Sequence, residues 1–250
     1  MIISVISFLI VFTTVVLVHE MGHFLTARKA GVKVYEFSIG FPFTPKIVTL
    51  FRHRETEFTL RLLPLGGFVS FSRDGDEDAR DLFGVSSLNR ALILSAGSLF
   101  NIGFAFLIFI LVFAAGKHLP LVQAILSSVK TVWSVIGGTI EFLVKTFSGQ
   151  GSWEGLAGPV GIAALAGKAA AKGLLNIMYF TGMLSLSLGI INLIPFPALD
   201  GGQLVMLLIE TIRKKPLSVK TYQAVNLVGF ALFILLSILV TYKDVVRLMA

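Results

Sequence analysis

The chain has 250 residues, of which 55% are hydrophobic and only 14% are charged, whereas soluble domains average roughly 25% charged residues. Its net charge of +7 could suit nucleic acid, but the basic residues flank apolar segments instead of forming a basic and aromatic patch. We therefore expect membrane lipid, and no nucleic acid, as a partner. The absence of cysteine excludes disulfides, thiolate metal sites and cysteine nucleophiles.

Four segments have the length and apolar character of transmembrane helices, so the predicted fold class is a mainly α membrane protein. They cover residues 2–27, 91–115, 174–194 and 224–242. The first segment lacks a cationic start and is too long for a signal peptide, so we expect it to be retained. By the positive-inside rule, the basic residues beside these spans place both termini outside. The cytoplasmic markers are Arg28, Lys29, Lys33, Arg90, Arg213, Lys214, Lys215 and Lys220.

The first span ends in the motif His19-Glu20-Met21-Gly22-His23. Two histidines four residues apart lie on one helix face, about 6 Å apart along the axis, and can bind one Zn²⁺. Ionisable groups inside a membrane helix are costly and usually mark function. Counted back from Arg28, the histidines lie roughly 7–14 Å inside the cationic helix end. The motif predicts Zn²⁺ as cofactor near the cytoplasmic side, with Glu20 as the general base that acts on its water.

The segment between the first two spans, residues 28–90, is more polar. Residues 32–38 and 57–63 alternate apolar and polar side chains, and the second run is followed by a predicted turn at Pro64 and Gly66-Gly67. This period predicts a small membrane-associated β-hairpin or sheet, with a plain surface hairpin as the alternative. An acidic loop at 72–80 follows. The edge of the second strand could bind an extended substrate by β-augmentation through Phe58, Thr59, Leu60, Arg61 and Leu62.

Residues 121–147 form an amphipathic helix that could either cross the membrane or lie flat on it. If this helix crossed, the third span would end on the side opposite His19, and a ligand there would be a bilayer's thickness away. We therefore predict an interfacial helix on the outer face, with Gly137-Gly138 as a candidate break.

A third zinc ligand is expected after the third span, where the chain reads Asn192-Leu193-Ile194-Pro195-Phe196-Pro197-Ala198-Leu199-Asp200-Gly201-Gly202. Irregular backbone at membrane depth is tolerated only where it is buried in protein or lines a cavity. Asp200 would complete a His₂-carboxylate set and leave a fourth position for water. As an alternative, Asp200 could simply cap a helix at 203–213, where aspartate is favoured.

Six short motifs occur in order along the chain. They begin at His19 (HEMGH), Phe37 (FSIGF), Pro64 (PLGGF), Gly97 (GSLFN), Gly158 (GPVGI) and Asn192 (NLIPFPALDG). Together they resemble the motifs of site-2 proteases, the intramembrane zinc metalloproteases, and especially the bacterial branch that cleaves anti-sigma factors. The resemblance covers nearly the whole length. It implies that residues 1–250 form one intramembrane protease domain of the bacterial inner membrane.

The resemblance also implies roles for single residues. It makes His19, His23 and Asp200 the zinc ligands and Glu20 the base, and it associates Asn192 with substrate handling. The expected substrates are transmembrane proteins such as anti-sigma factors or signal-peptide remnants.

The chain departs from the family pattern in two places. Ser98 replaces a proline in the motif that ends at Asn101, which weakens the case for Asn101 as a site residue. The bacterial relatives usually carry PDZ modules between the second and third spans, where this chain has only residues 116–173. A zinc-binding membrane protein or pseudoprotease that binds transmembrane helices without hydrolysis is the alternative, although coordination alone does not need Glu20.

Overall fold

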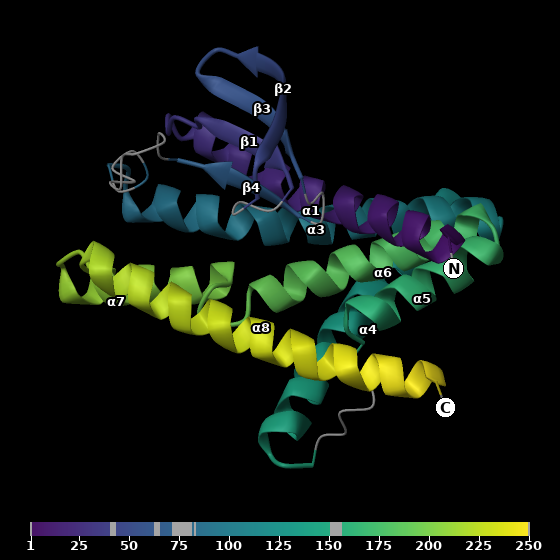
Figure 1. The fold of residues 1–250 in the computed structure, drawn as a ribbon. Coiled ribbons are helices and arrows are strands. Elements are labelled where there is room, and N and C mark those ends of the chain that lie inside the picture. Colours follow the sequence, from purple (N-terminus) through teal and green to yellow (C-terminus); the bar gives the residue numbers. More distant parts are fainter. Residues whose placement is uncertain are drawn as a thin grey trace. The chain divides into compact units, whose positions relative to one another are not determined.

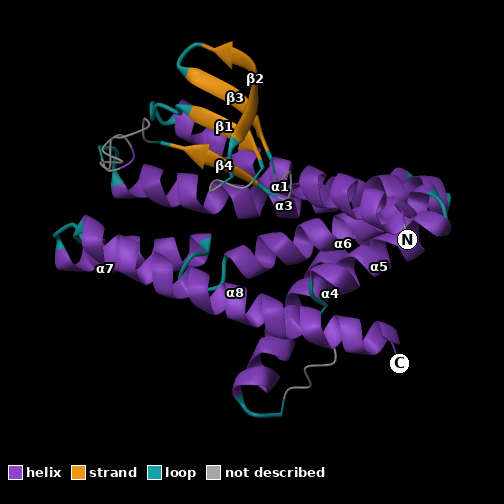
Figure 2. Ribbon diagram, viewed as in Figure 1, coloured by secondary structure: helices purple, strands orange, loops and turns teal. Residues whose placement is uncertain are grey.

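The computed structural model describes residues 2–40, 44–62, 66–71, 82, 84–150 and 157–249. Helices dominate, and a small sheet follows the first helix (Figures 1 and 2). The predicted acidic loop at 72–80 lies outside the described residues. The helices are α1 (Ile2–Lys29), α3 (Ser87–Gly116), α4 (Leu121–Phe147), α5 (Pro159–Ala171), α6 (Leu174–Asn192), α7 (Asp200–Arg213) and α8 (Val219–Met249).

The chain divides into two compact units. The helical unit contains Met1–Val11, Ile102–Ile190 and Phe230–Ala250. The sheet unit contains Phe12–Asn101 and Ile191–Gly229. Every residue of the candidate site belongs to the sheet unit.

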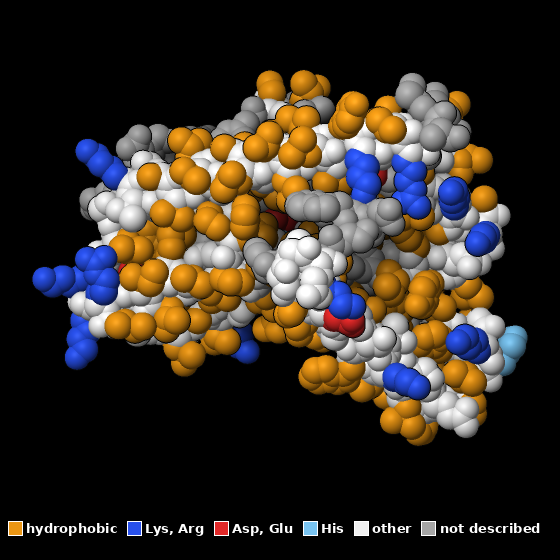
Figure 3. Space-filling view, turned by 90° about the horizontal axis from the view of Figure 1, so that it is seen from below, with side chains coloured by type: hydrophobic (Ala, Val, Ile, Leu, Met, Phe, Trp, Pro, Cys, Tyr) orange, Lys and Arg blue, Asp and Glu red, His pale blue; other side chains and the backbone are white. Residues whose placement is uncertain are grey.

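Five of the described helices are long and apolar enough to cross a membrane: α1, α3, α4, α6 and α8. Three of them, α1, α3 and α8, contain predicted spans, and α6 covers residues 174–192 of the span predicted at 174–194. α4 contains the predicted amphipathic helix. The candidate break at Gly137-Gly138 is wrong, because α4 continues through both glycines. Apolar side chains cover much of the molecular face in Figure 3, which suits contact with lipid.

The sheet has four strands in the order β2-β3-β1-β4. Their bounds are β1 (Glu36–Ile39), β2 (Lys46–His53), β3 (Thr56–Arg61) and β4 (Gly67–Ser70). β1 pairs in parallel with β3 and antiparallel with β4, and β2 and β3 form an antiparallel hairpin. The predicted sheet is therefore present, but Gly67 begins a strand instead of belonging to the expected turn.

The prediction that the strand of residues 57–63 presents a free edge is wrong. β3 is an interior strand, because β2 occupies one side of it and β1 the other. A paired strand has no backbone groups left for an added strand. Among the described residues, the open edges of the sheet belong to β2 and β4.

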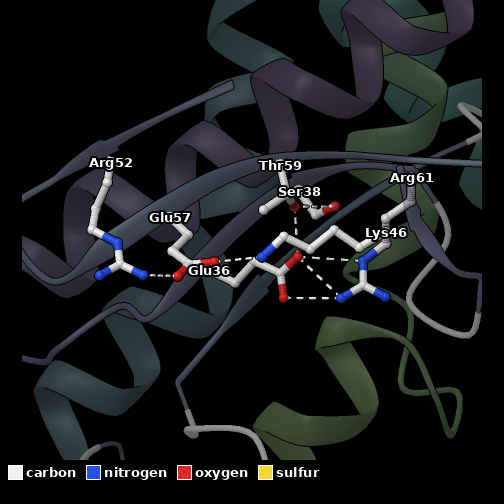
Figure 4. Close-up of polar contacts among 7 residues, drawn as sticks. All are labelled: Glu36, Ser38, Lys46, Arg52, Glu57, Thr59 and Arg61. Carbon is white, nitrogen blue, oxygen red and sulfur yellow. Dashed lines mark hydrogen bonds and ion pairs between the residues drawn. The ribbon is translucent and has the colours of Figure 1, made fainter. Parts of the chain in front are cut away.

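Side chains of β3 hold the sheet together. Arg61 pairs with the Glu36 carboxylate at 3.0 Å, and the Thr59 hydroxyl lies 2.9 Å from the Ser38 hydroxyl (Figure 4). Along the exposed strand β2, Lys46 and Arg52 both pair with Glu57 of β3. These contacts lower the pKa of the Glu57 carboxyl below its usual value.

One apolar cluster fixes the sheet onto the helices of its unit, as the strands drawn beside α1 and α3 in Figure 1 illustrate. Phe24 of α1 meets Phe37 and Phe58 of the sheet at ring-centroid distances of 5.5 and 5.7 Å. Ile93 of α3 belongs to the same cluster and is fully buried. The sheet is thereby held against the half of α1 that carries the two histidines.

Candidate metal centre

α1 presents His19 and His23 on one face, as their spacing predicts. Both residues are buried, at 7% and 9% exposure. Their rings meet edge to face with centroids 4.8 Å apart, and the two Nε2 atoms are 3.2 Å apart. Two nitrogen donors therefore converge on one point.

Asp200, the first residue of α7, brings a carboxylate to the same point. Its Oδ2 lies 3.2 Å from Nε2 of His19 and 3.4 Å from Nε2 of His23. Among the described residues, these three side chains are the one group of His, Asp or Glu with metal-binding spacing. Residues 181 positions apart thus meet, as the sequence predicts.

Glycines allow the chain before Asp200 to fold tightly. A Cβ at Gly201 would lie 2.3 Å from the carbonyl oxygen of Ile194, and one at Gly202 would lie 2.3 Å from that of Phe196. On the other side, Gly229 of α8 packs against Pro197, where a Cβ would be 2.4 Å from backbone atoms. The loop is therefore clamped between α7 and α8, which fixes the start of α7.

The three donor atoms fit a tetrahedral metal. Zn²⁺ with bonds of about 2.0–2.1 Å places its ligand atoms about 3.3–3.4 Å apart. The observed separations are 3.2, 3.2 and 3.4 Å. In addition, Oδ2 of Asp200 is buried and makes no hydrogen bond of good geometry. Buried polar atoms are normally satisfied, so this oxygen points to a cation between the three side chains.

The electrostatic setting keeps Asp200 ionised. Burial by itself raises the pKa of this carboxyl, but hydrogen bonds and positive charge from the imidazoles of His19 and His23 in their protonated form outweigh burial and lower the pKa below its usual value. The carboxylate form is the one that binds a divalent cation.

Backbone and amide groups of α3 orient the imidazoles. Nδ1 of His23 donates to the carbonyl oxygen of Ile93 at 2.7 Å, which leaves the Nε2 lone pair for a metal. Nδ1 of His19 lies 3.5 Å from the side-chain amide of Asn101, which is fully buried. Asn101, a candidate named from the sequence, therefore lies at the site. The Ile93 carbonyl could not be predicted, because a backbone carbonyl is present at every residue.

Gly97 is a site residue that the residue-level prediction missed. A Cβ at this position would lie 2.4 Å from Nε2 of His23 and 2.7 Å from Nε2 of His19. The nearby Gly22 of α1 is equally close to α3, since a Cβ there would lie 2.5 Å from the carbonyl oxygen of Ala96. α1 and α3 therefore cross with almost no space between their backbones, and any side chain at position 97 would fill the space of the donor atoms. The only available signal was the place of Gly97 in a recognised motif.

Glu20 lies beside the three donors and close to the sheet. Its side chain is half-buried, and a Cβ added to Gly67 would lie 3.0 Å from Cγ of Glu20 and 3.0 Å from the carbonyl oxygen of Ser38. The first residue of the edge strand β4 thus borders the carboxylate that the sequence predicts as base.

In the described part of the chain, the other predicted residues make no hydrogen bond to the donors. Asn192 is half-buried at the last position of α6, and in the described part of the chain no hydrogen bond links it to the three side chains. Phe58, Thr59 and Arg61 are engaged within the sheet. Leu60 is half-buried and Leu62 is 57% exposed just after β3.

Comparison with known proteins decides the family. The model of peptidase family M50 matches residues 7–236. The chain belongs to peptidase family M50. A zinc metalloprotease of Clostridium perfringens is 28% identical over 95% of this chain and 97% of its own length. The regulator of sigma-W protease RasP of Bacillus subtilis is 24% identical over 98% of this chain and 99% of its own length.

A third relative is more similar over a shorter stretch. The zinc metalloprotease RasP of Shouchella clausii is 45% identical over 41% of this chain and 24% of its own length. The alignment with the Bacillus subtilis protein runs over 419 positions, which is more than the 250 residues of this chain, so that relative carries residues with no counterpart here. As an M50 member the chain is a site-2-type zinc metalloprotease, and its long apolar helices make it a multi-pass membrane protein.

Proposed function

We propose that this M50 protease hydrolyses peptide bonds of transmembrane proteins at a zinc held by His19, His23 and Asp200. The main observation is that the two Nε2 atoms and Oδ2 of Asp200 lie 3.2–3.4 Å from one another. In addition, Oδ2 is buried and makes no hydrogen bond of good geometry. When bound, zinc would lower the pKa of a water molecule towards neutrality and polarise the scissile carbonyl group.

Glu20 acts as general base in this proposal. It takes a proton from the attacking water and returns it to the leaving amine. Ile93 holds His23 in the tautomer that exposes Nε2, and the side-chain amide of Asn101 lies beside Nδ1 of His19 at 3.5 Å. Gly67 lies beside the Glu20 side chain, since a Cβ added there would be 3.0 Å from Cγ of Glu20.

The edge of β4, in place of that of β3, is the proposed binding place for the substrate. A transmembrane helix hides its carbonyl groups in internal hydrogen bonds, so it must become locally extended before attack. Carbonyl oxygens of Gly66 and Ser70 face β1, because they accept from Gly40 and Tyr35. By the alternation of a strand, the backbone groups of Gly67 and Val69 face the open edge. An added substrate strand would there lie next to Glu20.

The relatives support a substrate class. The Bacillus subtilis relative is named as a regulator of sigma-W protease. We propose that this chain acts on membrane-bound regulators such as anti-sigma factors, or on signal-peptide remnants, in the bacterial inner membrane. Asn192 keeps its proposed role in substrate handling, since it ends the helix that leads into the ligand loop.

The proposed topology places the site near the cytoplasm and both termini outside. Asp200 follows α6 and meets His19 near the end of α1, so α1 and α6 end on the same side of the membrane. α3 crosses the membrane back to the outer side, and α6 starts on that side. The part of the chain that contains α4 and α5 must therefore begin and end outside. We therefore propose that α4 lies along the outer interface.

Labelling of single cysteines tests this topology, since the chain has no cysteine of its own. Cysteines placed at the exposed positions Lys33 and Lys214 should react from the cytoplasm, and one at Gly149 should react from outside. Opposite sidedness for Lys33 and Lys214 would contradict the proposal.

The enzymatic proposal is tested by combining metal analysis with cleavage of a model transmembrane segment. Glu20→Gln should keep nearly stoichiometric zinc and lose activity about 10²–10⁴-fold, because only proton transfer is removed. Equal hydrolysis by the variant would exclude Glu20 as base. Zinc binding by a wild type that cleaves no membrane substrate would favour a non-hydrolytic binding protein.

A further inference from the structure

A buried ion pair outside the metal centre joins α3 to α7. Nη1 of Arg90 donates to Oε2 of Glu210 at 2.8 Å, and the two side chains are only 10% and 6% exposed. Each charge opposes the dipole of its own helix, because Arg90 is in the first turn of α3 and Glu210 is in the last turn of α7. The helix dipoles therefore do not explain why these charges occur at these positions, whereas their pairing across the two helices does.

Further hydrogen bonds extend the pair to the start of α8. Oε1 of Glu210 accepts from the backbone N–H of Leu217 at 2.8 Å. Nη2 of Arg90 donates to the hydroxyl of Tyr222 at 3.2 Å. The network thus fixes the end of α7, the turn after it and the first turn of α8, all within the sheet unit.

The same face of α3 serves this pair and the metal centre. Arg90, Gly97 and Asn101 are seven and four residues apart, so they line one stripe of the helix. Gly97 contacts both imidazoles, and Asn101 lies near His19. α3 therefore contacts the two histidines through Gly97 and Asn101, and it contacts α7 through Arg90.

α7 connects the ion pair to the third ligand. Asp200 and Glu210 are ten residues apart, which is about 15 Å along the axis, and they lie within about 80° of each other around the helix. Two carboxylates on one side of α7 are thus tied to neighbouring helices at its two ends. Together they define both the tilt of α7 and its rotation about its own axis.

We propose that Arg90 and Glu210 are positioning residues that set the place of Asp200 and thereby the zinc affinity of the site. This inference rests on the proposed ligand set of His19, His23 and Asp200. Metal sites demand placement of ligands within about 0.5 Å, so a small rotation of α7 is enough to weaken binding. Loss of supporting contacts around a metal site typically lowers affinity 10–100-fold.

The test is zinc affinity of the full chain, measured by competition with a chromophoric chelator below the unfolding temperature. Glu210→Gln should bind zinc 10–100-fold more weakly than wild type and alter the visible spectrum of the Co²⁺-substituted protein. Asp244→Asn is the matched control, because Asp244 is also a buried carboxylate and accepts from Gly161 N–H in the helical unit. That control should bind zinc within about threefold of wild type.

Reversal of the pair separates positioning from general stability. Arg90→Glu combined with Glu210→Arg should recover part of the affinity that either single change loses, because the exchanged charges also suit both helix dipoles, although the Glu210→Arg side chain has no acceptor for the Leu217 N–H. Arg90→Lys provides a milder probe if Glu210→Gln does not fold, with a loss of about 3–10-fold expected. Wild-type affinity in Glu210→Gln or Arg90→Lys, or an equal loss in Asp244→Asn, would overturn the proposal.

Failure of the ligand assignment gives a different result. If wild type does not bind zinc, or if Asp200→Asn binds it unchanged, the ligand set itself is wrong. If wild type binds zinc and Asp200→Asn does not, an unchanged affinity in Glu210→Gln overturns only the role of the ion pair.

Discussion

Replacement of Gly97 by alanine tests whether the space between the two imidazoles is needed for zinc. The added Cβ would lie 2.4 Å from Nε2 of His23 and 2.7 Å from Nε2 of His19. Ordinary contacts between such atoms are about 3.5 Å, so one or both imidazoles must move by roughly 1 Å. This displacement exceeds the tolerance of about 0.5 Å for a working site. We expect zinc affinity and cleavage to fall at least about 100-fold.

Gly103→Ala is the matched control in the same helix, because a Cβ there meets nothing within 4 Å. Alanine favours a helix over glycine by about 1 kcal/mol, so neither variant should lose helix content for reasons of propensity. Zinc affinity is measured by chelator competition, and activity with a transmembrane substrate. Wild-type zinc binding and cleavage by Gly97→Ala would refute the assignment of the space beside Gly97 to the metal.

Three further predictions concern the ligand, the substrate edge and the metal. Asp200→Asn should lower zinc content and activity together, whereas unchanged zinc would leave this residue with the role of a helix cap. Val69→Pro removes a backbone donor from the open edge of β4 and should reduce cleavage about tenfold or more at normal zinc content. Thr59→Pro should instead disrupt the sheet itself, since β3 is paired on both sides. Similar behaviour of the two proline variants would argue against substrate binding at β4. Removal of zinc by a chelator should abolish cleavage, and added zinc should restore it in wild type but not in Glu20→Gln.

Local features of the chain could be predicted because their geometry depends on few neighbouring residues. The spacing of His19 and His23 on an apolar helix predicts two convergent imidazoles, since helical periodicity alone brings residues four apart together. The apolar spans follow from length and composition in the same way. Asp200 could be predicted as the partner because prolines and glycines mark irregular backbone where a membrane helix should end.

Strand order could not be predicted, because it depends on pairings between distant segments. The alternation of residues 57–63 correctly predicts a strand, but the same pattern fits an edge or an interior position. Only the folded chain places β2 and β1 on the two sides of β3 and leaves the edge of β4 open beside Glu20. For this reason, the proposed substrate-binding edge is that of β4 and not that of β3.

The sequence by itself determined the membrane class, the two histidines and the carboxylates that accompany them, because residue type and helical spacing carry that chemistry. Tertiary structure alone decided what surrounds them. Three contacts join separate helices: Gly97 lies against both imidazoles, His23 donates to the Ile93 carbonyl, and Arg90 pairs with Glu210. Such contacts depend on how close two backbones approach, and no periodicity within one segment records that distance.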